Sequence, residues 1–151
     1  MKYSIESVIH LPRDQVTALY GDPEHYPKWQ AGLAGRELME GTPGVVGAKH
    51  KVLFQMGKRS MEMTETLITN DMPDEFTLEY EAKGVDRNRV RTLFSDTEGG
   101  DTKLVVEQEF EFSGCMKVMG FLVPGAFKKQ SQRYMDAFKA FAENGTDVRN
   151  A

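Results

Sequence analysis

The feature that most constrains the fold is a regular series of turn signals between residues 40 and 101. Clusters rich in Gly, Pro, Asn and Asp recur there about every 12–16 residues, and apolar and β-branched residues fill the segments between them. Because strands joined by short turns pair with their chain neighbours, this spacing predicts one antiparallel meander. The expected strands span residues 34–40, 47–56, 59–69, 75–82, 86–96 and 102–112.

The N-terminal part of the chain predicts one further strand and two short helices. Residues 2–10 alternate between apolar and polar side chains, as in a half-buried strand. Pro12 and Pro23 stand at positions typical of a first helical residue, and Asp22 is a suitable N-cap for the second helix. These signals predict helices near residues 12–20 and 22–27.

The C-terminal part predicts the element that covers the sheet. After an apolar run at residues 115–123, Phe127, Tyr134, Phe138 and Phe141 recur at helical spacing. A sheet with one apolar face needs a cover, and this long helix is the only predicted element large enough. We therefore expect one α+β domain over residues 1–145, with a curved antiparallel sheet of about seven strands around the last helix and a frayed tail at 146–151.

Composition and spacing exclude several classes of function. The net charge of −4 argues against nucleic acid as the main partner. The single cysteine, Cys115, forbids an intrachain disulfide, and none of the three histidines has metal-ligand spacing, so we expect no metal site. No glycine-rich phosphate loop precedes a helix, and we expect no cofactor. No transmembrane segment and no signal peptide are predicted, so the expected location is cytoplasmic.

Charged residues on three neighbouring predicted strands indicate how those strands pair. Three-residue turns at 83–85 and 98–100 would set glutamates on both sides of a central row of arginines on the outer face. A slip by one residue would bury arginines, so this ladder of Glu and Arg side chains fixes the register of the strands. The glutamates also neutralise the arginines, which would otherwise form a positive stripe suited to nucleic acid. The expected pairs are Glu81–Arg87, Glu79–Arg89, Arg91–Glu107, Arg89–Glu109 and Arg87–Glu111.

A two-residue turn at Gly57-Lys58 would place His50 opposite Glu65 on the inner face of the sheet. A buried carboxylate beside an imidazole should favour the charged pair, lowering the pKa of the Glu and raising that of the His. Such a pair is a candidate acid/base or ligand-anchoring site. In the alternative interpretation, His50 lies at a solvated margin of the sheet.

Polar residues at expected inner positions favour a cavity over a solid core, because buried polar groups cost free energy unless they are bonded. The polar inner positions are Asn88, Thr92, Gln108, Ser131 and Tyr134. Methionines from different elements could converge on the same space and suit ligands of several shapes, although ordinary core filling explains each methionine as well. These methionines are Met56, Met61, Met63, Met116 and Met119.

The order of elements, together with the stretch Asp22-Pro23-Glu24-His25-Tyr26-Pro27-Lys28-Trp29, resembles the START-like or SRPBCC superfamily, and within it the polyketide cyclase/dehydrase and lipid-transport branch. The resemblance spans residues 2–144. It implies a helix-grip fold, in which a curved sheet wraps the last helix around a deep cavity, and binding of hydrophobic or amphipathic small molecules. It implies no single activity, and no catalytic residue carries over by position.

Three functions remain open. The leading hypothesis is binding or transport of a small hydrophobic ligand, with the Trp29 region and residues 115–123 flanking the entrance. The second is a cyclase or dehydratase-like enzyme that uses His50 and Glu65 as acid and base, and the third is a protein-interaction module without a ligand. The oligomeric state stays open. The predicted ligand-binding residues are His50, Phe54, Met61, Met63, Glu65, Tyr80, Asn88, Thr92, Gln108 and Tyr134.

Overall fold

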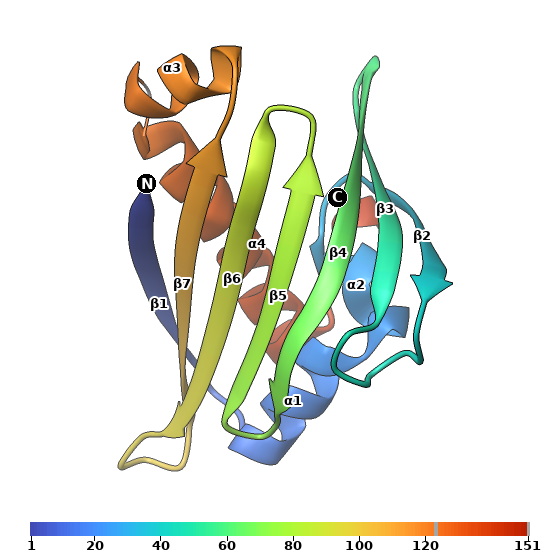
Figure 1. Cartoon of the computed structure of the whole chain (residues 1–151). Helices are drawn as coiled ribbons and strands as arrows, with labels where there is room; N and C mark the ends of the chain where they lie inside the picture. The colour runs from blue at the N-terminus through green and yellow to red at the C-terminus, as the bar shows by residue number, and fades with distance from the viewer. Residues whose placement is uncertain (123, 151) are drawn as a thin grey trace.

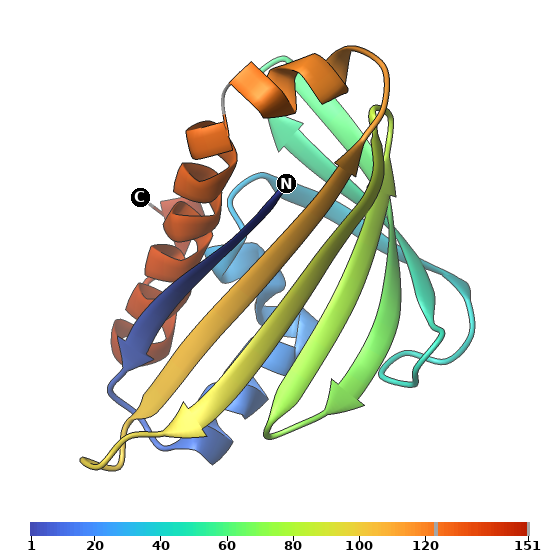
Figure 2. The same cartoon turned by 60° about the vertical axis from the view of Figure 1, so that its left-hand side comes forward.

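A curved antiparallel sheet wraps around one long helix, as Figures 1 and 2 show. The computed structural model describes residues 1–122 and 124–150, and of residues 119–122 and 124 it describes the backbone only. The sheet has seven strands in the order β1-β7-β6-β5-β4-β3-β2, so the predicted meander is present and β1 pairs with its last strand. The strands are β1 (Lys2–Ile9), β2 (Leu33–Glu40), β3 (Lys49–Met56), β4 (Arg59–Asp71), β5 (Glu75–Ala82), β6 (Val85–Asp96) and β7 (Thr102–Phe112).

The helices lie on the inner side of the sheet and at one end of it (Figure 2). The backbone N–H of Glu24 donates to Asp22 Oδ1 at 3.0 Å, so Asp22 is the predicted cap, although the turn that follows is a 3-10 helix. No helix within the described residues has the length and apolar composition needed to cross a bilayer. The helices are α1 (Arg13–Gly21), η1 (Pro23–His25), α2 (Tyr26–Trp29), α3 (Cys115–Leu122), α4 (Pro124–Asn144) and η2 (Val148–Asn150).

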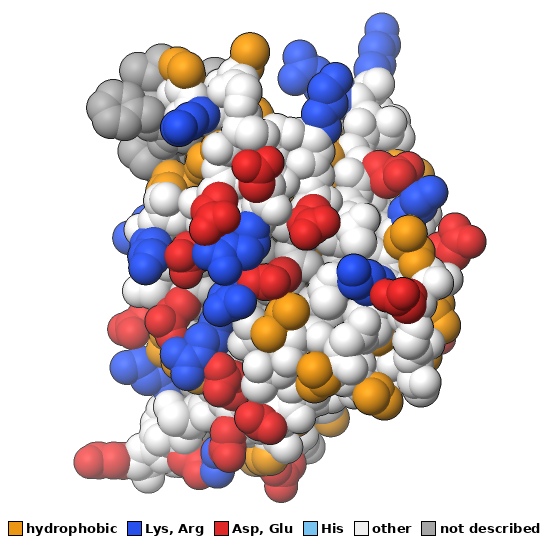
Figure 3. Space-filling view, viewed as in Figure 1, with side chains coloured by type: hydrophobic (Ala, Val, Ile, Leu, Met, Phe, Trp, Pro, Cys, Tyr) orange, Lys and Arg blue, Asp and Glu red, His pale blue; other side chains and the backbone are white. Residues whose placement is uncertain are grey.

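The register of the outer face agrees with most of the predicted ladder. Arg87 lies opposite Glu111, Arg89 opposite Glu109 and Arg91 opposite Glu107, while Glu79 lies opposite Arg89. Arg89 Nη2 and Glu79 Oε2 are 2.7 Å apart, as are Arg87 Nη2 and Glu111 Oε1. Figure 3 shows the acidic and basic side chains gathered over β6 and β7 on this face. Since such exposed pairs contribute only about 0.2–1 kcal/mol each, their main effect is on register.

The predicted pair Glu81–Arg87 is wrong, because the β5–β6 turn is shorter than expected. Ala82 pairs with Val85, so the turn holds two residues, and the register shifts between Tyr80 and Ala82. Gly84 takes the left-handed backbone conformation that this tight turn needs, with φ of +84°. The shift places an extra residue on β6 and takes Glu81 out of the ladder.

The core lies between the sheet and α4. Phe138 of α4 is 1% exposed and packs with Leu104 of β7 and Val16 of α1, which are both fully buried. Beyond α4 the expected frayed tail is wrong for residues 148–150, which form η2 and contact α2. The guanidinium of Arg149 closes this turn on Asp147, with Nη2 and Oδ2 2.6 Å apart. Residue 151 lies outside the described residues.

Candidate functional site

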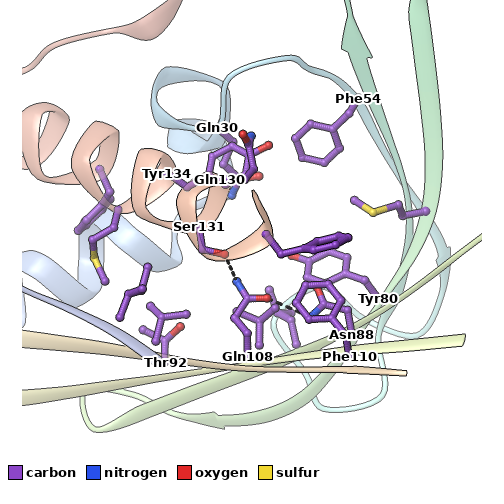
Figure 4. Close-up of a pocket in the computed structure, with 18 of the residues that line it drawn as sticks. Gln30, Phe54, Tyr80, Asn88, Thr92, Gln108, Phe110, Gln130, Ser131 and Tyr134 are labelled. Carbon is purple, nitrogen blue, oxygen red and sulfur yellow. Dashed lines mark hydrogen bonds between the residues drawn. The ribbon is translucent and has the colours of Figure 1, made fainter. Parts of the chain in front are cut away.

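A cavity of about 340 Å³ lies between the inner face of the sheet, α2 and α4, and Figure 4 shows part of its wall. Its lining is mostly apolar and aromatic, and among the described residues no charged side chain contributes to it. Met61 is 44% exposed, which places it at the rim of the cavity. Eight predicted ligand-binding residues line the cavity: Phe54, Met61, Met63, Tyr80, Asn88, Thr92, Gln108 and Tyr134.

The other two predicted site residues, His50 and Glu65, do not line the cavity. They lie opposite each other on β3 and β4, as the register predicted, and they are 5% and 4% exposed. The solvated margin considered for His50 is therefore wrong. Arg36 of β2 reaches both side chains, since its Nη2 donates to Glu65 Oε1 at 2.9 Å and lies 3.3 Å from His50 Nδ1. The three residues form a charged cluster beside the cavity, in which His50 and Glu65 are buried and the Arg36 side chain is 21% exposed.

The expected raised pKa of His50 is wrong. Its pKa is lowered, first by burial and then by the positive charge of Arg36, and the negative charge of Glu65 opposes this only in part. The guanidinium takes the place of a protonated imidazole as the partner of the carboxylate. His50 is therefore held neutral next to the Arg36–Glu65 pair.

Two tyrosines connect the charged cluster with the cavity. Tyr26 of α2 and Tyr80 of β5 both line the cavity. Burial raises the pKa of each phenol, and the negative charge of Glu65 raises it further. The guanidinium of Arg36 also lies over the Tyr26 ring, 5.4 Å from its centroid. Both phenols are thus neutral over the physiological pH range, and they lie between the cavity and the charged cluster.

The polar groups on the inner face bond largely to one another. The Asn88 amide donates to Gln108 Oε1 at 3.0 Å, and the Gln108 amide donates to Ser131 Oγ at 2.8 Å, as the dashed lines in Figure 4 show. Ser131 Oγ lies 2.7 Å from the hydroxyl of Tyr3. These bonds tie α4 to β1, β6 and β7 across one wall of the cavity. Most of these polar side chains therefore have hydrogen-bond partners within the protein and need no ligand as a partner. The sequence argument that they indicate a cavity is weaker than it appeared for this reason.

Sequence reasoning missed the residues that reach the site from the N-terminal third of the chain. Tyr20, Tyr26 and Gln30 line the cavity, and Arg36 completes the cluster behind it. Trp29, which was expected at the entrance, lines the cavity with them. The Tyr20 hydroxyl lies 2.9 Å from Thr92 Oγ1, which accounts for that polar inner position. The closely spaced aromatic residues around Pro23 and Pro27 were a usable signal for a cavity wall, because aromatic side chains bury a large apolar area when they pack against a sheet.

A second hollow of about 440 Å³ adjoins the cavity and shares Trp29, Met56, Gln130 and Tyr134 with it. It lies where the loop after α2 approaches α4 and the end of β3. Trp29 itself is only 6% exposed, so it is a wall of this passage and not a surface residue. On the other predicted side of the entrance, Met116 lines the cavity, while the side chains of residues 119–123 lie outside the described residues.

No group of three or more His, Cys, Asp or Glu side chains that could hold a metal ion occurs in the described part of the chain. The polar groups that line the described part of the site are neutral hydroxyl and amide groups on apolar walls. The ion pair of Arg36 and Glu65 lies behind the phenols of Tyr26 and Tyr80.

Comparisons with known proteins agree with this architecture. The model of the family described as polyketide cyclase/dehydrase and lipid transport matches residues 1–143. No curated protein matches the chain. One similar solved structure is Ara h 8.0201, with a TM-score of 0.74 and 16% identity over 94% of this chain and 97% of that chain. A second is ginseng major latex-like protein 151 from Panax ginseng, with a TM-score of 0.73 and 18% identity over 94% of this chain and 97% of that chain. A third is a protein from Rhizobium leguminosarum, with a TM-score of 0.77 and 18% identity over 95% of this chain and 94% of that chain. At these identities the likeness shows the fold, which is the expected helix-grip arrangement.

Proposed function

The chain belongs to the polyketide cyclase/dehydrase and lipid-transport family, and on that premise we propose that it binds or transports a small hydrophobic or amphipathic molecule in the cavity between the sheet and α4, in the cytoplasm. The observation that carries the proposal is the cavity itself. Its volume of about 340 Å³ lies within the range of small-molecule pockets, and its walls are apolar with a few polar groups.

The adjoining hollow supports an entrance between α4, the end of β3 and the loop after α2. Ala31, Gly32 and Gln55 line its outer part, and Met56 and Gln130 belong to both hollows. Met56 is 48% exposed, and the side chain has three rotatable bonds. A ligand would pass this rim by small movements of side chains, with no strand or helix displaced.

Binding is better supported than catalysis by His50 and Glu65. A general acid or base must come within hydrogen-bond reach of the reacting atoms, and neither residue lines the cavity. The Glu65 carboxylate is also engaged by Arg36. An interaction module has a candidate surface at Cys115 and Val118, which are exposed on α3, and Met39, Val45 and Val46 are exposed elsewhere. The cavity, however, has no role in that hypothesis.

The test uses N-phenyl-1-naphthylamine, an uncharged dye that becomes fluorescent in apolar sites. We expect saturable binding of one dye per chain. Ala82→Trp adds a ring inside the cavity and should weaken binding at least tenfold, whereas Glu81→Trp adds the same ring on the outer face of the same strand and should leave binding unchanged. Equal dye binding by both variants, or no saturable binding by the native chain, would refute the proposal. Native mass spectrometry of the purified protein then shows whether a molecule from the cell occupies the site.

A further inference from the structure

The β3–β4 turn, the β5–β6 turn and the helix α3 lie together at one end of the sheet, as Figures 1 and 2 show. The backbone N–H of Ser113, which precedes α3, donates to the carbonyl of Gly84 at 3.0 Å, so α3 begins next to the β5–β6 turn. Met56 of β3, Met61 of β4 and Met116 of α3 come from this end and line the cavity. The cavity therefore extends to this end of the molecule.

Six cationic side chains are exposed at this end, which we call the basic end, and Figure 3 shows basic side chains protruding there. Within the described residues, none of the six forms an ion pair. The arginines of the outer face differ, since Arg87, Arg89 and Arg91 each pair with a glutamate. The six cations are Lys58 and Arg59 at the β3–β4 turn, Lys83 in the β5–β6 turn, Lys117 on α3, and Lys128 and Lys129 near the start of α4.

The acidic residues that are nearest along the chain are paired elsewhere or face away from the cavity. Glu62 pairs with Lys51, and Glu111 pairs with Arg87. Residues 81 and 86, which are both acidic, lie on the outer face, because their neighbours 82 and 85 line the cavity. Like charges repel one another, so six cations without acidic partners do not stabilise the fold. Their gathering indicates an anionic partner outside the molecule.

The charge is distributed unevenly between the two ends of the molecule. The chain as a whole carries a net charge of −4, and exposed acidic residues occur at the end opposite to the basic end. Among them are Glu40 at the end of β2, Asp71 at the end of β4 and Glu98 in the β6–β7 turn. An anionic surface would attract the basic end and repel the opposite end, which would orient the molecule.

Apolar side chains are exposed among these cations. Val118 of α3 is 59% exposed, and Met56 and Met61 at the rim of the cavity are 48% and 44% exposed. At a bilayer surface, apolar groups enter the boundary between headgroups and acyl chains, while Lys and Arg side chains meet anionic headgroups. This combination favours a lipid surface over a purely ionic partner such as an acidic protein.

We propose that the basic end docks on the surface of an anionic lipid bilayer, with Val118, Met56 and Met61 entering the headgroup boundary. The inference goes beyond the proposed function, because it assigns a partner to the outside of the molecule. The docked cavity would face the bilayer, so a hydrophobic ligand could pass between the two without crossing water.

Flotation of the native chain with lipid vesicles tests the docking. Vesicles of phosphatidylcholine alone are compared with vesicles that contain phosphatidylserine as about a third of their lipid. We expect the chain to bind the phosphatidylserine vesicles at least tenfold more tightly in 0.1 M KCl. This preference should disappear in 1 M KCl, because the screening length falls from about 10 Å to about 3 Å. Equal binding to both kinds of vesicle, or binding to neither, would overturn the inference.

Paired lysine variants locate the contact on the molecule. Lys58→Gln combined with Lys83→Gln should weaken binding to phosphatidylserine vesicles about twentyfold, since each lysine near an anionic bilayer contributes about fivefold. Lys49→Gln combined with Lys103→Gln makes the same change in net charge at the opposite end of the sheet and should leave binding within about twofold. None of the four lysines lines the cavity, so both variants should bind the dye as the native chain does. Equal loss of vesicle binding in both variants would show that net charge alone is responsible and would refute docking by the basic end.

A second pair of variants distinguishes a bilayer from a purely ionic partner. Val118→Ser removes an exposed apolar side chain from the basic end and should weaken vesicle binding at least threefold. Val45→Ser changes a similarly exposed valine in the loop between β2 and β3 and should leave binding unchanged. The same binding by both variants would contradict entry of Val118 into the headgroup boundary.

The outcomes distinguish this inference from the proposed function. Saturable dye binding without binding to phosphatidylserine vesicles contradicts the inference alone, whereas vesicle binding without saturable dye binding contradicts the proposed function alone. The comparison of the two kinds of vesicle uses the native chain, so a variant that fails to fold does not remove the test.

Discussion

At the scale of single residues, the charged cluster is organised by Arg36, which sequence reasoning did not include. Its guanidinium satisfies Glu65 and approaches His50, so the imidazole stays neutral with a lowered pKa. The opposition of His50 and Glu65 was predictable, because the two-residue turn at Gly57-Lys58 fixes every pair along β3 and β4. The position of Arg36 was not predictable, because β2 pairs with β3 through two register shifts and its sequence shows no clear alternation of apolar and polar residues.

The lowered pKa of His50 predicts that acid destabilises the fold. Below the ordinary histidine pKa of about 6.5, the unfolded chain takes up a proton at this position that the folded chain resists, so the free energy of unfolding falls as the pH drops from about 7 to 5. His50→Gln should remove this part of the loss, measured by urea unfolding at pH 7.5 and 5.5. His10→Gln, at an exposed histidine whose Nδ1 lies 2.9 Å from Asp101 Oδ2, should retain the His50 contribution. An unchanged loss in the His50→Gln variant would contradict the neutral imidazole.

At the scale of elements, short turns decide the register, and the β5–β6 turn shows the limit of reading them from sequence. Its glycine marked the turn correctly, but the same residues fit a loop of two or three residues, and the structure uses two with a shift in register. The side chain of Met116 packs over Gly84, and its Cγ would lie 2.5 Å from a Cβ added there. This contact joins the turn to α3, which a pairing argument based on strands alone could not predict.

Gly84→Ala should therefore lower the free energy of unfolding by about 1–2 kcal/mol, because alanine is strained at positive φ and its methyl group meets Met116. Gly99→Ala is the matched control in the β6–β7 turn, where φ is ordinary and the nearest atom to the added Cβ lies 4.0 Å away. This variant should stay within about 0.5 kcal/mol of the native chain. Chemical unfolding at constant pH measures both. Equal destabilisation of the two variants would show that loss of any turn glycine, and not the left-handed conformation, is responsible.

At the scale of the whole molecule, the sheet and its helix were predictable, and so was much of the cavity lining. Alternation along the strands identifies inner residues wherever a face is buried, as it did for Asn88, Thr92 and Gln108. The boundary of the cavity was not predictable, because it depends on where α2 rests on the sheet. Tyr26 and Trp29 of α2 are buried and form part of the wall, and Tyr26 lies between the cavity and Arg36. Glu65 and His50 consequently lie behind the cavity wall.

A hollow core makes the stability of the protein depend on ligand concentration. Since a molecule that binds only the folded chain adds RT ln(1 + [L]/Kd) to the free energy of unfolding, N-phenyl-1-naphthylamine at 100 times its Kd should add about 2.7 kcal/mol. The slope of that free energy against urea concentration should stay constant, because the surface exposed on unfolding hardly changes. Ala82→Trp, which weakens binding at least tenfold, should cut the gain to about 1.4 kcal/mol or less at the same dye concentration. Glu81→Trp should keep the full gain, since only the first side chain lies in the cavity. The same gain in the Ala82→Trp variant would place the dye outside the space between the sheet and α4.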